Sequence, residues 1–98
     1  MYLHIGGDVT IRLKTVVAIL DMENTTTSKI TKEFLRMAEE EGFVIPVSED
    51  LPKSYVIIEE GEGNRIYLSP ISSATLLKRA EESGAFLNDR DWKGEAHL

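Results

Sequence analysis

The apolar residues among the first 20 fall into three short groups, and this pattern predicts three short strands. Residues 2–5 begin the first strand, and Gly6-Gly7-Asp8 supplies a tight turn because glycine adopts positive φ without steric cost. Residues 9–13 alternate with the period of a half-buried strand whose apolar positions face the core. The near-continuous apolar run over 16–20 favours a central strand that is covered on both faces.

The following segment has the spacing of an amphipathic helix. Residues 24–28 are of the types that cap helix N-termini. Apolar residues then recur at helical spacing, at Ile30, Phe34, Met37 and Ala38. We expect a helix over about 27–41, ended by Gly42. The three glutamates at 39–41 oppose the negative end of the helix dipole, and the sequence offers no reason for them.

The second half of the chain predicts an isolated strand and a hairpin. Residues 43–45 favour a short strand that lies at a sheet edge or ends at Pro46, which has no N–H to donate. Residues 55–58 and 65–68 are typical of two strands joined by the turn at 61–64.

A second helix is expected after Ser72, which would cap it, and it would end at Gly84. The element order is therefore βββ-α-β-ββ-α. This order predicts an α+β fold, a small single domain with short antiparallel strands and two helices over residues 1–84. Residues 85–98 have no clear period and are expected to form a flexible C-terminal tail.

Length and composition exclude several classes of protein. The 98 residues include no cysteine, which excludes a disulfide scaffold, a thiolate nucleophile and a Cys-based metal site. No signal peptide is visible, and no apolar run approaches the roughly 20 residues of a membrane span. We therefore expect a cytoplasmic protein without a membrane partner. A domain this small buries only about two thirds of its chain surface, so support from self-assembly is expected.

The sequence carries no motif for catalysis, for a cofactor or for a metal. His4 and His97 lie near opposite ends of the chain, and a lone histidine on a strand is most often structural. The one Gly-x-Gly, at 61–63, joins two strands and holds an acid at its centre, so it does not suit a phosphate. We expect a protein that is not an enzyme and has no cofactor.

The formal net charge of −6 disfavours nucleic-acid binding, which needs clustered cations. The negative charge is local, however, because residues 39–62 hold eight acids and one base, Lys53. The remaining residues sum to +1. The acidic stretch is either a solvated surface or a contact for a basic partner, and a weakly basic face elsewhere stays open.

Two basic sets stand outside the acidic stretch. Arg12 and Lys14 share one face of the predicted strand, opposite to its apolar side. Lys78 and Arg79 lie on the second helix. These cations either form ordinary surface ion pairs or contact phosphates. No aromatic residues are interleaved with them, which disfavours single-strand binding.

Three stretches resemble the RemA/RemB family, small bacterial regulators of extracellular-matrix (biofilm) genes. They are YLHIGGD at 2–8, PKSYVI at 52–57 and IYLSPISSATLLKRA at 66–80. The resemblance covers about residues 1–80, and the Ser-Pro-x-Ser-Ser stretch is its most specific part. It is closer to the RemB branch than to RemA.

The RemA branch implies a DNA-binding transcriptional regulator whose subunits form a ring, so that many weak contacts add along curved DNA. On this resemblance, the arginines that RemA uses for DNA fall at Thr15, Leu51 and Pro52. Only their neighbours Lys14 and Lys53 are basic, which makes these two lysines candidate DNA contacts.

Two further candidates complete the set. Arg12 joins it from the strand-face argument, and Arg79 matches a basic position near the end of the family's helix. The resemblance implies two partners, double-stranded DNA and further copies of the chain. The copies would join head to tail through strand edges near 43–45 or through the first hairpin. The alternative is an acidic protein–protein interaction module that has lost DNA binding and contacts a basic protein.

Overall fold

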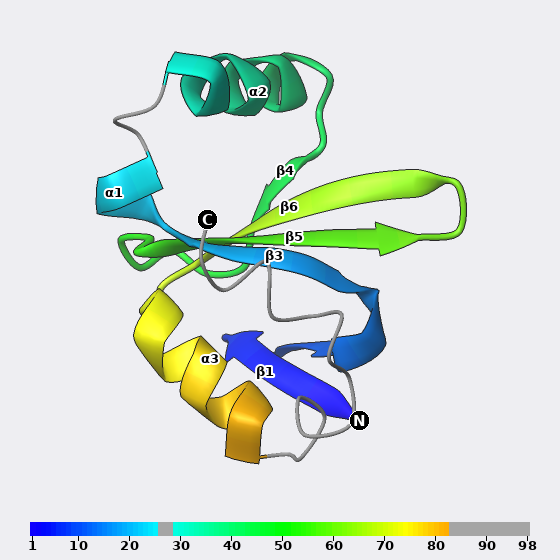
Figure 1. The fold of residues 1–98 in the computed structure, drawn as a ribbon, viewed down its shortest axis with the longest axis vertical. Coiled ribbons are helices and arrows are strands. Elements are labelled where there is room, and N and C mark those ends of the chain that lie inside the picture. The colour runs from blue at the N-terminus through cyan, green and yellow to red at the C-terminus, as the bar shows by residue number, and fades with distance from the viewer. Residues whose placement is uncertain (26–28, 83–98) are drawn as a thin grey trace.

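The computed structural model describes residues 1–25 and 29–82 (Figure 1). In chain order, its elements are β1 (Tyr2–Gly6), β2 (Val9–Arg12), the 3₁₀ turn η1 (Leu13–Thr15), β3 (Val16–Asp21), α1 (Met22–Thr25), α2 (Lys29–Glu40), β4 (Val44–Pro46), β5 (Ser54–Glu60), β6 (Gly63–Ser69) and α3 (Ser73–Glu82). The predicted order of strands and helices is confirmed, with α1 as an additional single turn. Gly84 and the tail at 85–98 lie outside the described residues.

The strands form two sheets, and helices pack against the larger one. A four-stranded sheet has the order β3-β5-β6-β4, and β1 and β2 form a separate hairpin. The hairpin and α3 lie on one face of the larger sheet, and α2 lies over the other face (Figure 1). This arrangement confirms the predicted α+β class.

The main core fills the space between the larger sheet, the hairpin and α3. Alternate residues of each strand point into it, as the period of two requires. Its buried members are Leu3, Ile5, Ile11, Leu13, Val16, Ile19, Val56, Ile58, Leu76 and Ala80. The opposite sheet face, which carries the register-aligned Ala18, Ile57 and Ile66, faces α2.

A polar junction ties the hairpin to the end of β6. The Ser69 hydroxyl donates to the carbonyl of Ile5 at 2.6 Å and accepts from the N–H of Ile71 at 3.0 Å. The Ser54 hydroxyl donates to the carbonyl of Ile71 at 2.7 Å. Both serines are fully buried, and each has a partner, so neither leaves an unsatisfied hydroxyl in the core.

Three strand predictions are corrected by the structure. The apolar run at 16–20 forms β3, which pairs only with β5 within the described chain and is an edge strand, not a central one. An apolar run indicates that both faces of a strand are buried, but it does not indicate how many strands pair with it. The predicted strand at 9–13 ends at Arg12, because Leu13–Thr15 turns into η1.

The third correction concerns strand direction. β4 pairs with β6 in parallel, whereas short antiparallel strands were predicted throughout. A parallel pair needs a long crossover, and the loop after β4 together with β5 supplies it. The prediction that this strand lies at an edge and ends at Pro46 is confirmed.

Ser72 caps α3 as predicted. Its hydroxyl accepts a hydrogen bond from the N–H of Thr75 at 3.2 Å, which satisfies one of the unpaired donors at the helix start.

Replacing Ser72 with alanine is expected to lower the free energy of unfolding by about 1 kcal/mol, because this donor loses its partner. Urea denaturation followed by circular dichroism measures the change. Ser72→Asp retains a capping oxygen and should stay within a few tenths of a kcal/mol of the parent. Equal losses in both variants would contradict the capping role.

Candidate nucleic-acid interface

Arg12 and Lys14 lie at the end of the hairpin where the chain turns toward β3. Arg12 is paired opposite Tyr2, and both side chains are exposed on the outer face of the hairpin. Lys14 is exposed on η1. The expectation that these two cations share one strand face is therefore wrong, because the strand stops between them. They remain close neighbours in the chain at one corner of the fold.

Arg79 lies on α3 and reaches the outer edge of β1. Its Nη1 donates to the carbonyl of His4 at 3.3 Å and lies 3.5 Å from His4 Nδ1. His4 Nε2 lies 2.8 Å from the carbonyl of Gly7, which assigns the proton to Nε2 and leaves Nδ1 as an acceptor. The guanidinium thus binds a strand edge, and it remains exposed for a second contact.

Lys53 lines an open concavity of about 670 Å³ between α1, the loop before β5 and the start of α3. Its backbone is fixed by two hydrogen bonds, from Lys53 N–H to the carbonyl of Ser69 at 2.7 Å and from Met22 N–H to the carbonyl of Lys53 at 3.1 Å. Asp21 and Glu23 line the same concavity. A phosphate here meets one cation and two carboxylates, whose charges sum to −1, so the charged groups that line the concavity disfavour a phosphate.

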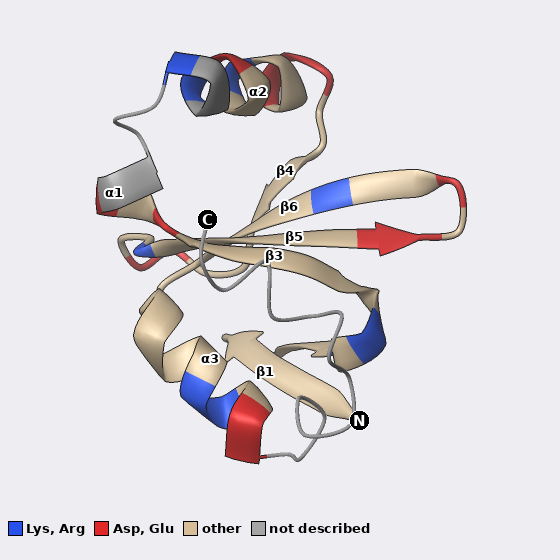
Figure 2. Cartoon of the chain, viewed as in Figure 1, with Lys and Arg blue, Asp and Glu red and all other residues tan. Residues whose placement is uncertain are grey.

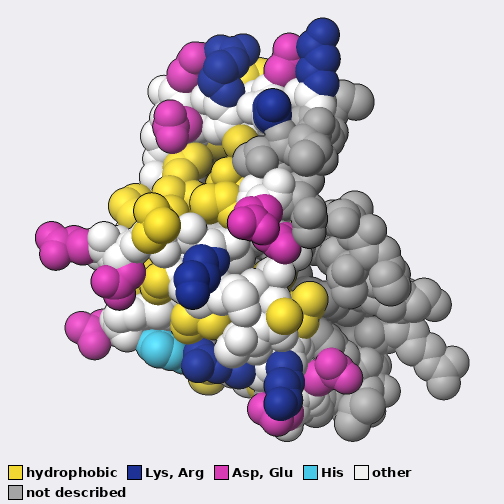
Figure 3. Space-filling model, turned by 90° about the vertical axis from the view of Figure 1, so that its left-hand side faces the viewer, with side chains coloured by type: hydrophobic (Ala, Val, Ile, Leu, Met, Phe, Trp, Pro, Cys, Tyr) yellow, Lys and Arg dark blue, Asp and Glu magenta, His cyan; other side chains and the backbone are white. Residues whose placement is uncertain are grey.

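The four candidate cations do not converge. Figure 2 places the basic segment between β2 and β3 on one side of the molecule and those of α3 and of the loop before β5 on the other. Figure 3 shows that the Lys and Arg side chains of the latter face are interrupted by acidic and apolar ones. These four described residues are therefore separate cations that form no continuous basic patch with one another.

Comparison with known proteins identifies a family and one similar protein. The family described as "RemA-like: Extracellular matrix regulatory protein A-like" matches residues 2–80. The chain is also 37% identical, over 81 residues, to "Extracellular matrix regulatory protein B" of Bacillus subtilis (strain 168), which covers 83% of this chain and 91% of that protein. The chain belongs to the RemA-like family.

The structure places the three residues of this RemA-like chain at which the resemblance puts arginines. Thr15 is buried, and its hydroxyl donates to the carbonyl of Arg12 at 2.7 Å, closing η1. Leu51 is 83% exposed, and Pro52 is half-buried, and both line the concavity of Lys53. Thr15 therefore has a structural role, whereas the exposed Leu51 and the half-buried Pro52 line the concavity without adding a charge.

The described titratable side chains of this RemA-like protein form no cluster that suits a metal. Residues 1–25 and 29–82 contain no group of three or more His, Asp or Glu side chains that would hold such an ion. Burial, with a smaller contribution from Glu39, raises the pKa of Tyr55 above its ordinary value of 10.0, so the phenol stays protonated at neutral pH. None of the described helices is long and apolar enough to cross a membrane.

One surface was missed by the sequence reasoning. A concavity of about 400 Å³ separates α2 from the β5–β6 hairpin and is lined mainly by Phe34, Met37, Phe43 and Ile66, with Glu41 and Glu62 beside them. The helical spacing assigned Phe34 and Met37 to the buried face of α2, but they are 48% and 58% exposed. The sequence carried no signal for this exposure, because helical spacing alone does not separate Phe34 and Met37 from Ala38, the residue near the end of α2 that is buried.

Proposed function

We propose that this protein is a non-enzymatic, cytoplasmic regulator of extracellular-matrix (biofilm) genes that binds double-stranded DNA as a homo-oligomeric ring. The observation that carries the proposal is membership of the RemA-like family over residues 2–80, together with the relative in Bacillus subtilis that is named an extracellular matrix regulatory protein.

The scattered cations support a multivalent mode of DNA binding. Each subunit offers Arg12, Lys14, Lys53 and Arg79 as separate exposed charges, and each contact with a phosphate is weak. Repetition around a ring raises the avidity without new contacts in any one subunit. Sequence preference would then arise from the bending of the duplex more than from base contacts.

Replacing Lys53 with glutamine is expected to weaken DNA binding at about 50 mM salt and to reduce its salt dependence. Each phosphate contact contributes about 0.9 to the slope of log K against log salt, so the loss is about 0.9 for each subunit on the DNA. Fluorescence anisotropy with promoter DNA, read at several salt concentrations, measures both quantities. Lys29→Gln on α2 is the matched control and should change neither slope nor affinity. No binding by the parent protein at about 50 mM salt would remove DNA as the partner.

A protein–protein module is the second candidate, favoured by the carboxylates of Asp21 and Glu23 beside Lys53 and by the net charge of −6. On this alternative, the acidic stretch at 39–62 contacts a basic protein. Capture of a basic protein from the native host, with no nucleic acid bound in the same complex, would favour this function over DNA binding.

A further inference from the structure

The concavity beside α2, here called the α2 groove, is an apolar surface that stays open among residues 1–25 and 29–82. It is formed by Phe34, Met37, Phe43 and Ile66. The first three of these side chains are about half exposed, at 48%, 58% and 46% in chain order. A cluster of large apolar side chains in a concave surface is typical of an interaction site, whereas single exposed apolar residues need no explanation.

The rim of the α2 groove is acidic. Glu41 and Glu62 line it from α2's end and from the β5–β6 turn. Glu33 lies one helical turn before Met37, on the same side of α2. Within residues 1–25 and 29–82, no ion pair engages any of these three carboxylates. The groove therefore suits an apolar occupant that carries positive charge.

The same chain displays such an occupant at the start of its first hairpin. Met1 and Tyr2 are 68% and 67% exposed. Arg12 is paired opposite Tyr2, and the N–H of Leu13 donates to the carbonyl of Met1 at 2.9 Å, which brings Lys14 to the same place. We call Met1, Tyr2, Arg12 and Lys14 the basic corner. In the described part of the chain, neither of its two cations is held in an ion pair.

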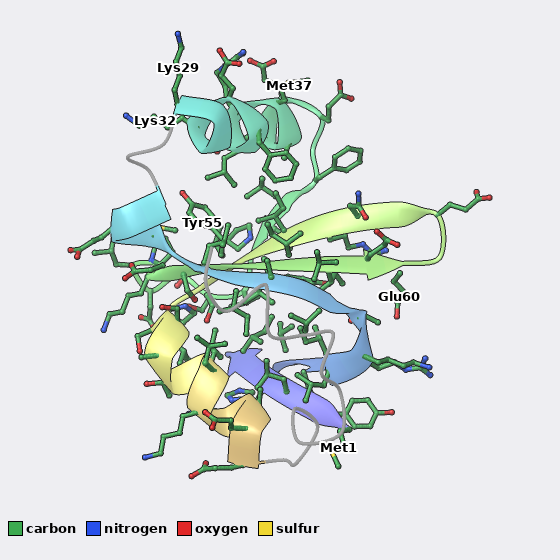
Figure 4. The ribbon with its side chains drawn as sticks, in the orientation of Figure 1. Met1, Lys29, Lys32, Met37, Tyr55 and Glu60 are labelled. Atoms are coloured by element: carbon green, nitrogen blue, oxygen red, sulfur yellow. The ribbon has the colours of Figure 1, made fainter. Side chains whose placement is uncertain are left out.

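The α2 groove and the basic corner cannot meet within one subunit. Figure 4 shows Met37 and Met1 at opposite ends of the longest axis of the molecule, which measures 35 Å. A second copy can supply the missing half, since each copy offers one groove and one corner. Contacts between two different surfaces repeat head to tail, and they close into a ring when the rotation between copies allows it.

We propose that the basic corner of one subunit docks in the α2 groove of the next, with Tyr2 and Met1 against Phe34, Met37 and Phe43. Arg12 and Lys14 then face Glu41 and Glu62. This inference rests on the self-association in the proposed function, and it assigns Arg12 and Lys14 to the subunit contact in place of DNA. It also gives a reason for the glutamates at the end of α2, which are unfavourable in the isolated helix.

Charge complementarity selects a second copy over an unrelated protein as the occupant. Both halves of the contact are present on each chain in equal number, and they have opposite charge and matching apolar character. A basic helix from another protein could fill the α2 groove, but the exposed basic corner would then have no binding partner.

Charge exchange tests which surfaces meet. Association is measured by sedimentation velocity at about 50 mM salt. The double variant Arg12→Glu with Lys14→Glu is expected to associate at least about tenfold more weakly than the parent. The double variant Glu41→Lys with Glu62→Lys is expected to show a loss of the same size. All four changes in one chain should restore association to within a few-fold of the parent. Lys78→Glu with Lys32→Glu adds the same charge as the corner pair at other places and should leave association unchanged. Failure of the fourfold variant to recover, with folded spectra, would overturn the pairing.

Mixing two blocked variants tests the head-to-tail arrangement. Met37→Glu blocks only the groove and Tyr2→Glu blocks only the corner, both at exposed positions, so each alone should be monomeric. An equimolar mixture should form a dimer that cannot grow, since one intact corner and one intact groove remain. A mixture that stays monomeric, or variants that assemble like the parent, would overturn the inference.

DNA anisotropy on the same samples separates this inference from the proposed function. If the parent assembles and binds DNA while the blocked variants still assemble, the surfaces are wrong and the proposed function stands. If the parent itself is monomeric at micromolar concentration, both the inference and the ring are wrong. If the fourfold charge exchange restores assembly but not DNA binding, the exclusive assignment of Arg12 and Lys14 to the subunit contact is wrong.

Discussion

Replacing Leu76 with alanine is expected to lower the free energy of unfolding by about 3 kcal/mol. Leu76 projects from α3 into the main core and is completely buried. The truncation removes apolar burial and leaves a cavity that the surrounding strands fill only in part. Since a small domain is stabilised by only about 5–15 kcal/mol, the variant should lose a large part of its stability.

Urea denaturation monitored by circular dichroism measures this loss. Lys78→Ala, two residues further along α3 and exposed, is the matched control and should change stability by less than about 0.5 kcal/mol. A loss below about 1 kcal/mol for Leu76→Ala would mean that α3 is not packed in the core as the structure places it.

The second large effect is expected at Gly6, where alanine should destabilise the protein by about 3 kcal/mol. The backbone of Gly6 has a φ of 130°, which side-chain-bearing residues rarely adopt. A Cβ there would also lie 2.8 Å from Pro70 Cδ and 3.0 Å from Val47 Cγ2. Strain and overpacking each cost about 1–3 kcal/mol, so both contribute to the loss.

Two other glycines separate these causes. Gly61 has a φ of 64°, and a Cβ added there would have no neighbour within 4 Å, so Gly61→Ala carries the backbone cost alone, about 1 kcal/mol. Gly63 has neither a positive φ nor a neighbour, and Gly63→Ala should be nearly neutral. Thermal unfolding that ranks Gly6 no higher than Gly61 would contradict the close approach of Pro70.

The order of the elements was predictable because each depends on local pattern and local chemistry. The turn glycines, the cap at Ser72 and the helical spacing of α3 all act within a few residues. The neighbours of β3 and the parallel pairing of β4 depend on contacts between distant segments, and periodicity carries no information about these. The same limit explains why Phe34 and Met37 were expected in the core.

The candidate site was less predictable than the fold. The sequence indicates Arg12, Lys14, Lys53 and Arg79 as candidate cations. It does not show that Asp21 and Glu23 lie beside Lys53, or that Arg79 reaches the carbonyl of His4. The motifs behind the family resemblance have a different physical basis. Gly6 approaches Pro70, Ser69 binds Ile5 and Ser54 binds Ile71, so all three stretches meet at one structural junction. The residues that carry the family resemblance therefore stabilise the fold, and they indicate a shared fold more directly than shared DNA contacts.

The hydrogen bond between Ser69 and Ile5 joins residues 64 positions apart, and this separation has a consequence for synthesis in the cell. The hairpin leaves the ribosome first, but the serine that anchors it is added only 64 residues later. At about 5–20 residues per second, the nascent hairpin waits roughly 3–13 s for its anchor. During this interval Leu3 and Ile5 are exposed, so the emerging chain depends on prompt completion or on a chaperone until α3 closes the core.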